Sequence, residues 1–176
     1  GDVRVRRPPR FPDVPGFLTL QCDFHTHTVF SDGGVWPDVR SEEAWREGYD
    51  AIAITDHIEY QPHRADLPTN HERAWEIAAP PGEKLGVLVI RGSEITRKMP
   101  PGHLNAVFLT ASTPLATPEW RDALRAARDQ GGTQGRGPGC QGFQGLPLMR
   151  PTGGAGGAGL ARKIRGILDR ESAAPP

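Results

Sequence analysis

The run AIAITDH at residues 51–57 decides the fold class. Residues 51–54 are apolar at every position, which is typical of a strand that is buried on both faces of a parallel sheet. Asp56 and His57 follow at the carboxyl end of that strand, where parallel α/β folds build their sites. The run therefore predicts an α/β protein with functional residues at its strand ends.

Further strands and helices alternate on both sides of this run. The sequence predicts strands at 17–24, 87–90 and 104–109 and helices at 41–48, 70–79 and 117–130. Ser41 and Thr117 are the expected helix caps, and Pro80-Pro81-Gly82 is the expected end of the second helix. With the run at 51–54, the order predicts about four strands in a mainly parallel sheet or barrel.

Both ends of the chain differ in composition from residues 17–132, which we expect to form the domain. Residues 1–16 are rich in Pro and Arg and predict an extended lead-in. Between residues 131 and 159, 12 of 29 residues are Gly, so too little apolar surface is available to offset the entropy of ordering. We expect residues 133–176 to be a disordered low-complexity tail with one amphipathic helix at 160–170.

The overall charge and the cysteines restrict the class of protein. Lys plus Arg and Asp plus Glu both number 21, which disfavours a nucleic-acid or anionic-membrane partner. No apolar run reaches the roughly 20 residues of a membrane span.

Cys22 and Cys140 predict no disulfide framework. The chain begins with Gly, so a removed signal slightly favours a periplasmic or secreted location over the cytoplasm. The oligomeric state is not predicted.

Histidines and a glutamate follow three of the expected strands. His25 and His27 are two residues apart, so both imidazoles can point the same way from an extended segment. His57 follows the second strand and Glu94 the third, which brings four ligands to one rim of the sheet. Imidazole and carboxylate ligands suit Zn, Mn or Fe, and a glutamate can bridge two ions.

Two further residues are candidate ligands. His103 precedes the strand at 104–109, and Asp32 lies in a Ser-Asp-Gly-Gly turn close to the His pair. Each residue also has a structural explanation by itself, because Asp32 is a common turn residue and His103 could be a solvated loop histidine. Polar residues beside apolar runs are costly without a partner, which favours a joint metal site.

Four motifs in this order resemble the PHP family, named for polymerase and histidinol phosphatase. They are DFHTHTVFSDG at 23–33, AIAITDHIEY at 51–60, RGSEIT at 91–96 and PGHLNAVFL at 101–109. The resemblance covers roughly residues 17–130 and is greatest to small bacterial phosphodiesterase-like members, often exported. It implies a distorted (β/α)7 TIM-like barrel with two or three divalent metal ions at the strand C-termini.

The resemblance also implies roles for residues. His25 and His27 would bind the first metal, Glu94 would bridge the first and second, and His103 would bind the second. Asp32 and His57 would bind the third, although His57 could instead be an acid or base. The implied activity is hydrolysis of a small phosphorylated substrate, which could be a phosphomonoester, a phosphodiester or a nucleotide. Arg97 and Lys98 could hold the phosphate or form a solvated pair.

The family pattern is incomplete, which leaves two alternatives open. The family continues with a strand ending in Asn-His-Pro and a later Asp-x-His pair, but no histidine follows His103. We therefore expect an incomplete barrel and hypothesise a frame shift or truncation from about residue 133, which reading the coding DNA in the other frames tests. One alternative is an inactive fragment. The other is an amidohydrolase-type enzyme, whose barrel also begins with H-x-H.

Overall fold

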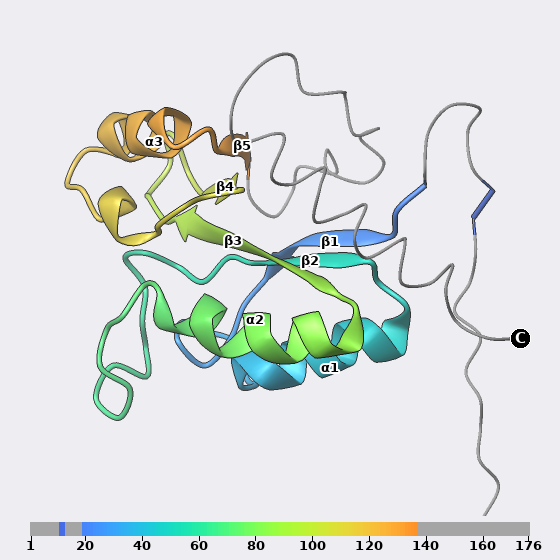
Figure 1. The fold of residues 1–176 in the computed structure, drawn as a ribbon. Coiled ribbons are helices and arrows are strands. Elements are labelled where there is room, and N and C mark those ends of the chain that lie inside the picture. Colours follow the sequence, from blue (N-terminus) through green and yellow to red (C-terminus); the bar gives the residue numbers. More distant parts are fainter. Residues whose placement is uncertain (1–10, 13–18, 137–176) are drawn as a thin grey trace, which may run out of the picture. The chain divides into compact units, whose positions relative to one another are not determined.

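The computed structural model describes residues 11–12 and 19–136, which lie in the first of two compact units, residues 1–145 and 146–176 (Figure 1). The expected lead-in, most of the expected tail and the helix expected at 160–170 lie outside the described residues. The elements are β1 (Cys22–Thr26), α1 (Pro37–Glu47), β2 (Ala51–Ile54), α2 (Arg73–Leu85), β3 (Leu88–Ile95), β4 (Leu104–Val107), the short 3-10 helix η1 (Thr113–Leu115), α3 (Trp120–Asp129) and β5 (Thr133–Arg136).

The strands form one sheet in the order β1-β2-β3-β4-β5. β1, β2 and β3 are parallel, as expected, whereas β4 and β5 run antiparallel to their neighbours. The predicted parallel arrangement is therefore confirmed for β1, β2 and β3 but wrong for β4, the last of the predicted strands. For β4 the reason is length, because residues 96–103 are too short a connection for the crossover of a dozen or more residues that a parallel pair needs. Within residues 19–136 the sheet does not close into a barrel.

Helices α1 and α2 lie side by side on one face of the parallel strands (Figure 1). Alternate residues of β2 point to opposite faces, so Ile52 and Ile54 pack under these helices while Ala51 and Ala53 pack with Phe24 on the other face. All four β2 residues are buried, which confirms the doubly buried strand predicted from the run at 51–54. This rigid parallel unit carries the site at its carboxyl edge.

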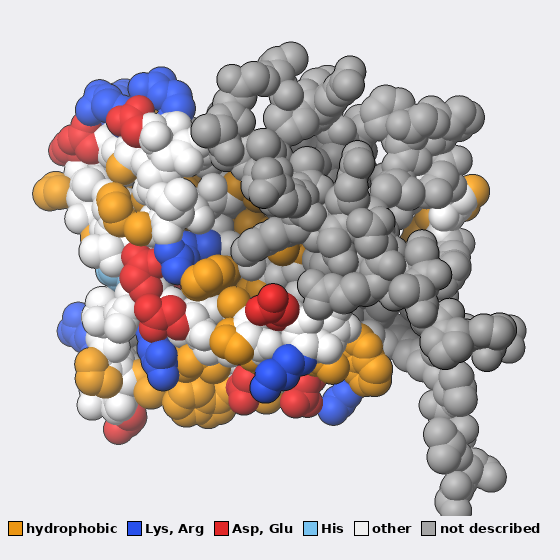
Figure 2. Space-filling model, viewed as in Figure 1, with side chains coloured by type: hydrophobic (Ala, Val, Ile, Leu, Met, Phe, Trp, Pro, Cys, Tyr) orange, Lys and Arg blue, Asp and Glu red, His pale blue; other side chains and the backbone are white. Residues whose placement is uncertain are grey.

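A second core lies under α3, where the packed residues come from β3, β4, η1 and α3. Its buried members are Ile58, Ile95, Ala106, Leu109, Leu115, Ala123 and Ala127. On the surface, acidic and basic side chains are interspersed, with basic side chains over α3 and hydrophobic ones over α1 and α2 (Figure 2). Among the described helices none has the length and apolarity that crossing a bilayer requires.

The helix boundaries differ from those expected. α1 begins at Pro37, with Trp36 as its N-cap, and Ser41 is buried inside the helix, where its hydroxyl donates to Ala78 O at 2.7 Å. α3 begins at Trp120 rather than at Thr117. The predicted caps are therefore wrong, because Trp36 and Glu119 are the N-cap residues and neither makes a capping hydrogen bond with its side chain.

Helix α2 continues through Pro80 and Pro81 to Leu85, so the prediction that the prolines end it is wrong. A proline has a helix-compatible φ, but inside a helix it removes one backbone hydrogen bond and its ring clashes with the carbonyl of residue i−4. Packing against α1 and β3 offsets that cost here. Gly82 lies so close to β3 that an added Cβ would be 2.3 Å from Val89 Cγ2.

Strand β5 begins where the sequence predicts a low-complexity tail. Residues 133–136 pair with β4, with Thr133 opposite Val107 and Arg136 opposite Leu104. The prediction of no strand here is wrong for these four residues. The reason is that a strand at a sheet edge is held by main-chain hydrogen bonds to its neighbour, which need no apolar side-chain pattern.

Candidate metal centre

The backbone of the sheet brings the expected ligands to one edge. β1 includes His25, and β3 extends further than expected, so that it includes Glu94. Beyond the end of β2, His57 forms a parallel bridge with Glu94, in which Glu94 N donates to Asp56 O at 3.1 Å and Ile58 N donates to Glu94 O at 2.9 Å. Main-chain pairing therefore sets His57 and Glu94 beside each other.

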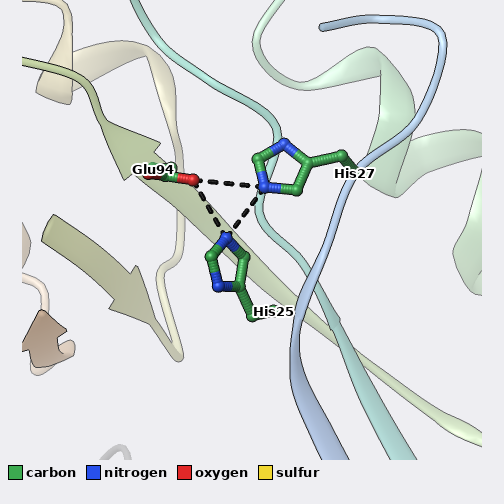
Figure 3. Close-up of side chains that lie close together, drawn as sticks. All are labelled: His25, His27 and Glu94. Carbon is green, nitrogen blue, oxygen red and sulfur yellow. Dashed lines mark hydrogen bonds and ion pairs between the residues drawn. The ribbon is translucent and has the colours of Figure 1, made fainter. Parts of the chain in front are cut away.

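The first group of facing side chains is His25, His27 and Glu94 (Figure 3). The Nε2 atoms of the two histidines are 2.8 Å apart, and they lie 3.0 and 3.1 Å from Glu94 Oε2. Ligand atoms on a tetrahedral zinc ion with bonds of about 2.0–2.1 Å are roughly 3.3 Å apart. These three atoms are therefore spaced nearly as the ligands of one such ion are.

Two further groups share members with the first. His103 Nδ1 lies 2.5 Å from Glu94 Oε1 and His57 Nδ1 lies 3.7 Å from Glu94 Oε2, which makes a group of His57, Glu94 and His103. Asp32 lies 3.2 Å from His27 Nδ1 and 3.4 Å from His57 Nε2, which makes a third group. The structure thus brings together all six predicted ligands, and Glu94 presents its two oxygens to different histidines.

Glu94 is the electrostatic centre of this cluster. It is 0% exposed, and its ion-pair partners among the described residues are all histidines. Burial by itself would raise the pKa of the carboxyl, but hydrogen bonds from His25 and His27 outweigh burial and hold that pKa well below its usual range. A buried, ionised carboxylate surrounded by imidazoles, which can give up a proton to bind a metal, fits a site for divalent cations.

The two most buried histidines shift in opposite directions. Burial lowers the pKa of His57, so that its imidazole is held neutral, which is the form that binds a metal. For His27, burial also acts to lower the pKa, but the hydrogen bond and the charge of Glu94 outweigh it and raise the pKa. A cation bound beside Glu94 would replace the proton that this carboxylate attracts to His27.

Asp56 has a role that sequence reasoning missed. The sequence placed it only at the end of a strand, whereas in the structure its carboxylate accepts hydrogen bonds from Thr28 and Ser31 in the loop after β1. Gly33 closes this loop so tightly that an added Cβ would be 2.5 Å from the carbonyl carbon of His27. The partners are 25 to 28 residues apart in the chain, so no local pattern could have revealed them.

Arg97 follows β3, and its polar partners are outside the three ligand groups. Its guanidinium forms an ion pair with Glu59 and donates to Thr117 O at 2.6 Å. Glu59 also accepts a hydrogen bond from Thr96 N at 2.6 Å, so Arg97 belongs to the support of this loop. Lys98 is exposed. A role of either residue in holding phosphate stays a prediction.

The chain is similar over most of its length to a two-domain protein from Bacteroides vulgatus, whose crystal structure contains a predicted PHP-like metal-dependent phosphoesterase. The two chains are 50% identical with a TM-score of 0.72, and the match covers 76% of this chain and 39% of that one. This chain therefore spans well under half of that protein.

Other comparisons add little. A candidate metal-dependent phosphoesterase from Bifidobacterium adolescentis is 26% identical, over 60% of this chain and 33% of that one, with a TM-score of 0.44 that supports no argument. No family model and no curated protein matches the sequence. The 50% identity to a PHP-like protein agrees with the order of the four motifs and with the convergence of their polar residues. The similarity supports assignment of this chain to the PHP family.

Proposed function

We propose that this chain carries the metal site of a metal-dependent phosphoesterase. The observation that carries the proposal is the overlap of three potential ligand groups at one sheet edge, with Glu94 in two of them. The similarity to a two-domain protein with a predicted phosphoesterase supports the same activity class. This chain covers 39% of that protein, so the activity of the whole protein is not assumed for it and has to be tested on the chain itself.

The proposed ligand roles are those that the family resemblance implies, and the three groups are compatible with them. His25 and His27 would hold a first cation, Glu94 would bridge to a second held by His103, and Asp32 and His57 would hold a third. Zn, Mn or Fe would suit these donors. Such cations polarise phosphoryl oxygens and lower the pKa of bound water, which is the chemistry that phosphoester hydrolysis needs.

Exposure of the ligands indicates the side from which a substrate would approach. The side chains of Asp32 and His103 are both 44% exposed, whereas those of His57 and Glu94 are 6% and 1% exposed. A small phosphorylated substrate would therefore meet the site between Asp32 and His103. The burial of His57 favours its role as a ligand over that of an acid or base that exchanges protons with solvent.

The test compares substrates on metal-reconstituted protein. The purified chain is stripped with a chelator and reloaded with Mn or Zn, and hydrolysis of a phosphomonoester, a phosphodiester and a cyclic amide is measured beside metal content. We expect metal-dependent phosphoester hydrolysis that Glu94→Gln abolishes. Hydrolysis of the cyclic amide alone would identify an amidohydrolase, and metal uptake without any turnover would identify an inactive fragment.

A further inference from the structure

The carboxylate of Asp56 holds the loop that connects His27 to Asp32, although Asp56 belongs to none of the three ligand groups. Asp56 Oδ1 accepts hydrogen bonds from Thr28 N at 2.7 Å and from Ser31 Oγ at 2.6 Å. Asp56 Oδ2 accepts a third, from Thr28 Oγ1 at 2.7 Å. Both carboxylate oxygens are thus used by protein donors, which assigns Asp56 to support of the site and not to metal binding.

The direction of these hydrogen bonds determines where His27 carries its proton. An ionised carboxylate can only accept, so the hydroxyl of Ser31 donates its single hydrogen to Asp56. The oxygen of Ser31 then has only lone pairs to offer His27 Nδ1, which lies 3.3 Å away. An oxygen of Asp32, also an acceptor, lies 3.2 Å from the same nitrogen. Nε2 also faces an acceptor, Glu94 Oε2 at 3.1 Å, so a cation in the first group would have to replace the hydrogen on Nε2. Nδ1, with acceptors on two sides, would then keep its own hydrogen.

The other nitrogen of His27 is then free to bind a cation. A neutral imidazole has one N–H, so a hydrogen on Nδ1 leaves a lone pair on Nε2. That Nε2 is the atom that faces His25 and Glu94 in the first group (Figure 3). It follows that His27 serves the first group alone, and that Asp32 and His57 remain as the ligands of the third.

We propose that Asp56 is a positioning residue that acts through Ser31 to set the tautomer of His27 and through Thr28 to hold the loop of Asp32; this inference rests on the proposed metal site. Both partners are fully buried, so water cannot replace the bonds that they make. The main chain of Asp56 also accepts the N–H of Glu94. One residue thereby sets the relative positions of ligands from β1 and β3.

Two variants test this relay, and each has a matched control. Ser31→Ala removes the hydroxyl between Asp56 and His27, and Asp56→Ala removes the acceptor. Ser41→Ala is the control for the first, because Ser41 is also fully buried but donates to a carbonyl of α2. Asp50→Ala is the control for the second, because Asp50 accepts a backbone N–H at the opposite end of β2.

Zinc affinity, measured by competition with a chromophoric chelator, is the first readout. Loss of a group that orients a metal ligand weakens metal binding by about 10–100-fold. We expect a loss of this size for Ser31→Ala and Asp56→Ala and less than about threefold for both controls. Asp56→Asn should lie between, because an amide oxygen can still accept from Ser31. Thermal melts of the chelator-treated proteins show which variants fold. If Asp56→Ala does not fold, Ser31→Ala alone tests the relay.

The second readout is the tautomer itself, observed by long-range ¹H–¹⁵N NMR of histidine in the zinc-loaded protein. We expect His27 to bind zinc through Nε2 and to carry hydrogen on Nδ1. Zinc on Nδ1, or wild-type affinity in Ser31→Ala, would overturn the proposed relay while zinc binding itself persisted. A wild-type chain that takes up no zinc would instead overturn the proposed function.

Discussion

Replacing Glu94 by glutamine tests the centre of the site directly. The substitution keeps the size and shape of the side chain and removes its charge. Glu94 belongs to two of the three ligand groups and is 0% exposed, so neither another carboxylate of those groups nor water can take its place. We therefore expect zinc binding to suffer more from Glu94→Gln than from loss of any single histidine.

The magnitude follows from the burial of the charge. Removing one partner of a buried ionic interaction costs about 3–5 kcal/mol, which corresponds to a loss of about 10²- to 10³-fold or more in affinity. With zinc in large excess, such a loss lowers the zinc-dependent free energy of unfolding by the same amount, about 3–5 kcal/mol. At roughly 4 °C per kcal/mol for a domain of this size, the zinc-dependent rise in Tm should shrink by roughly 12–20 °C.

The assay is a pair of thermal melts for each protein, one with excess zinc and one with chelator, beside elemental analysis of bound zinc. Glu72→Gln is the control, because Glu72 is a carboxylate of the same domain whose partners are Ser112, Thr113 and Arg91. It should lower both melts about equally and leave the zinc-dependent difference unchanged. If Glu94→Gln retains the wild-type zinc content and zinc-dependent rise in Tm, then Glu94 holds no cation.

Three further results are expected. Asp32→Asn should remove one bound zinc per chain and leave the rest, because Asp32 belongs to one ligand group; elemental analysis that shows complete loss would contradict separate groups. In chelator, the low pKa of Glu94 stabilises the fold fully above its ordinary value of 4.5, and this stability is lost as the pH falls through the lower folded pKa. Urea unfolding of Glu94→Gln should therefore depend less on pH in that window, and equal slopes for both proteins would refute the sign. Gly92→Ala should lower the free energy of unfolding by about 1–3 kcal/mol, because the new Cβ would be 2.8 Å from Ala106 O, whereas Gly34→Ala, with nothing within 4 Å, should cost far less.

The ligand residues were predictable because their signal is local. Each lies within or beside a short apolar run, and a buried polar side chain in that setting needs a partner. Parallel strands then place the ends of successive runs at one edge, so His57 and Glu94 could be assigned to the same site from β2 and β3 alone. His103 reaches that edge by a different route, because antiparallel β4 begins beside the end of β3.

The support of the site was not predictable in this way. Asp56 looks like an ordinary residue after a strand, and its hydrogen-bond partners lie in a loop 25 to 28 residues earlier. The sequence also did not reveal that the guanidinium of Arg97 forms an ion pair with Glu59 and donates to Thr117 O. The partner of a polar side chain is set by which donor or acceptor lies nearest to it in space. The number of residues between two positions in the sequence does not reveal that distance.

The boundaries of elements show the same division. The order of local propensities suggested that Pro80 and Pro81 would end α2, but packing of the helix against α1 and β3 carries it to Leu85. Composition suggested no strand after Gly132, but pairing with β4 extends the sheet to Arg136. In each case the contacts made with another element outweighed a local preference of about 1–3 kcal/mol.

By itself the sequence determined the α/β class, the doubly buried strand at 51–54 and the six candidate ligands, because apolar periodicity and isolated polar residues are properties of short segments. Only the tertiary structure decided that β4 and β5 run antiparallel, that the ligands form three overlapping groups around Glu94, and that Asp56 orients them. Those features depend on distances between side chains from separate elements, and such distances exist only once the sheet and its helices have packed.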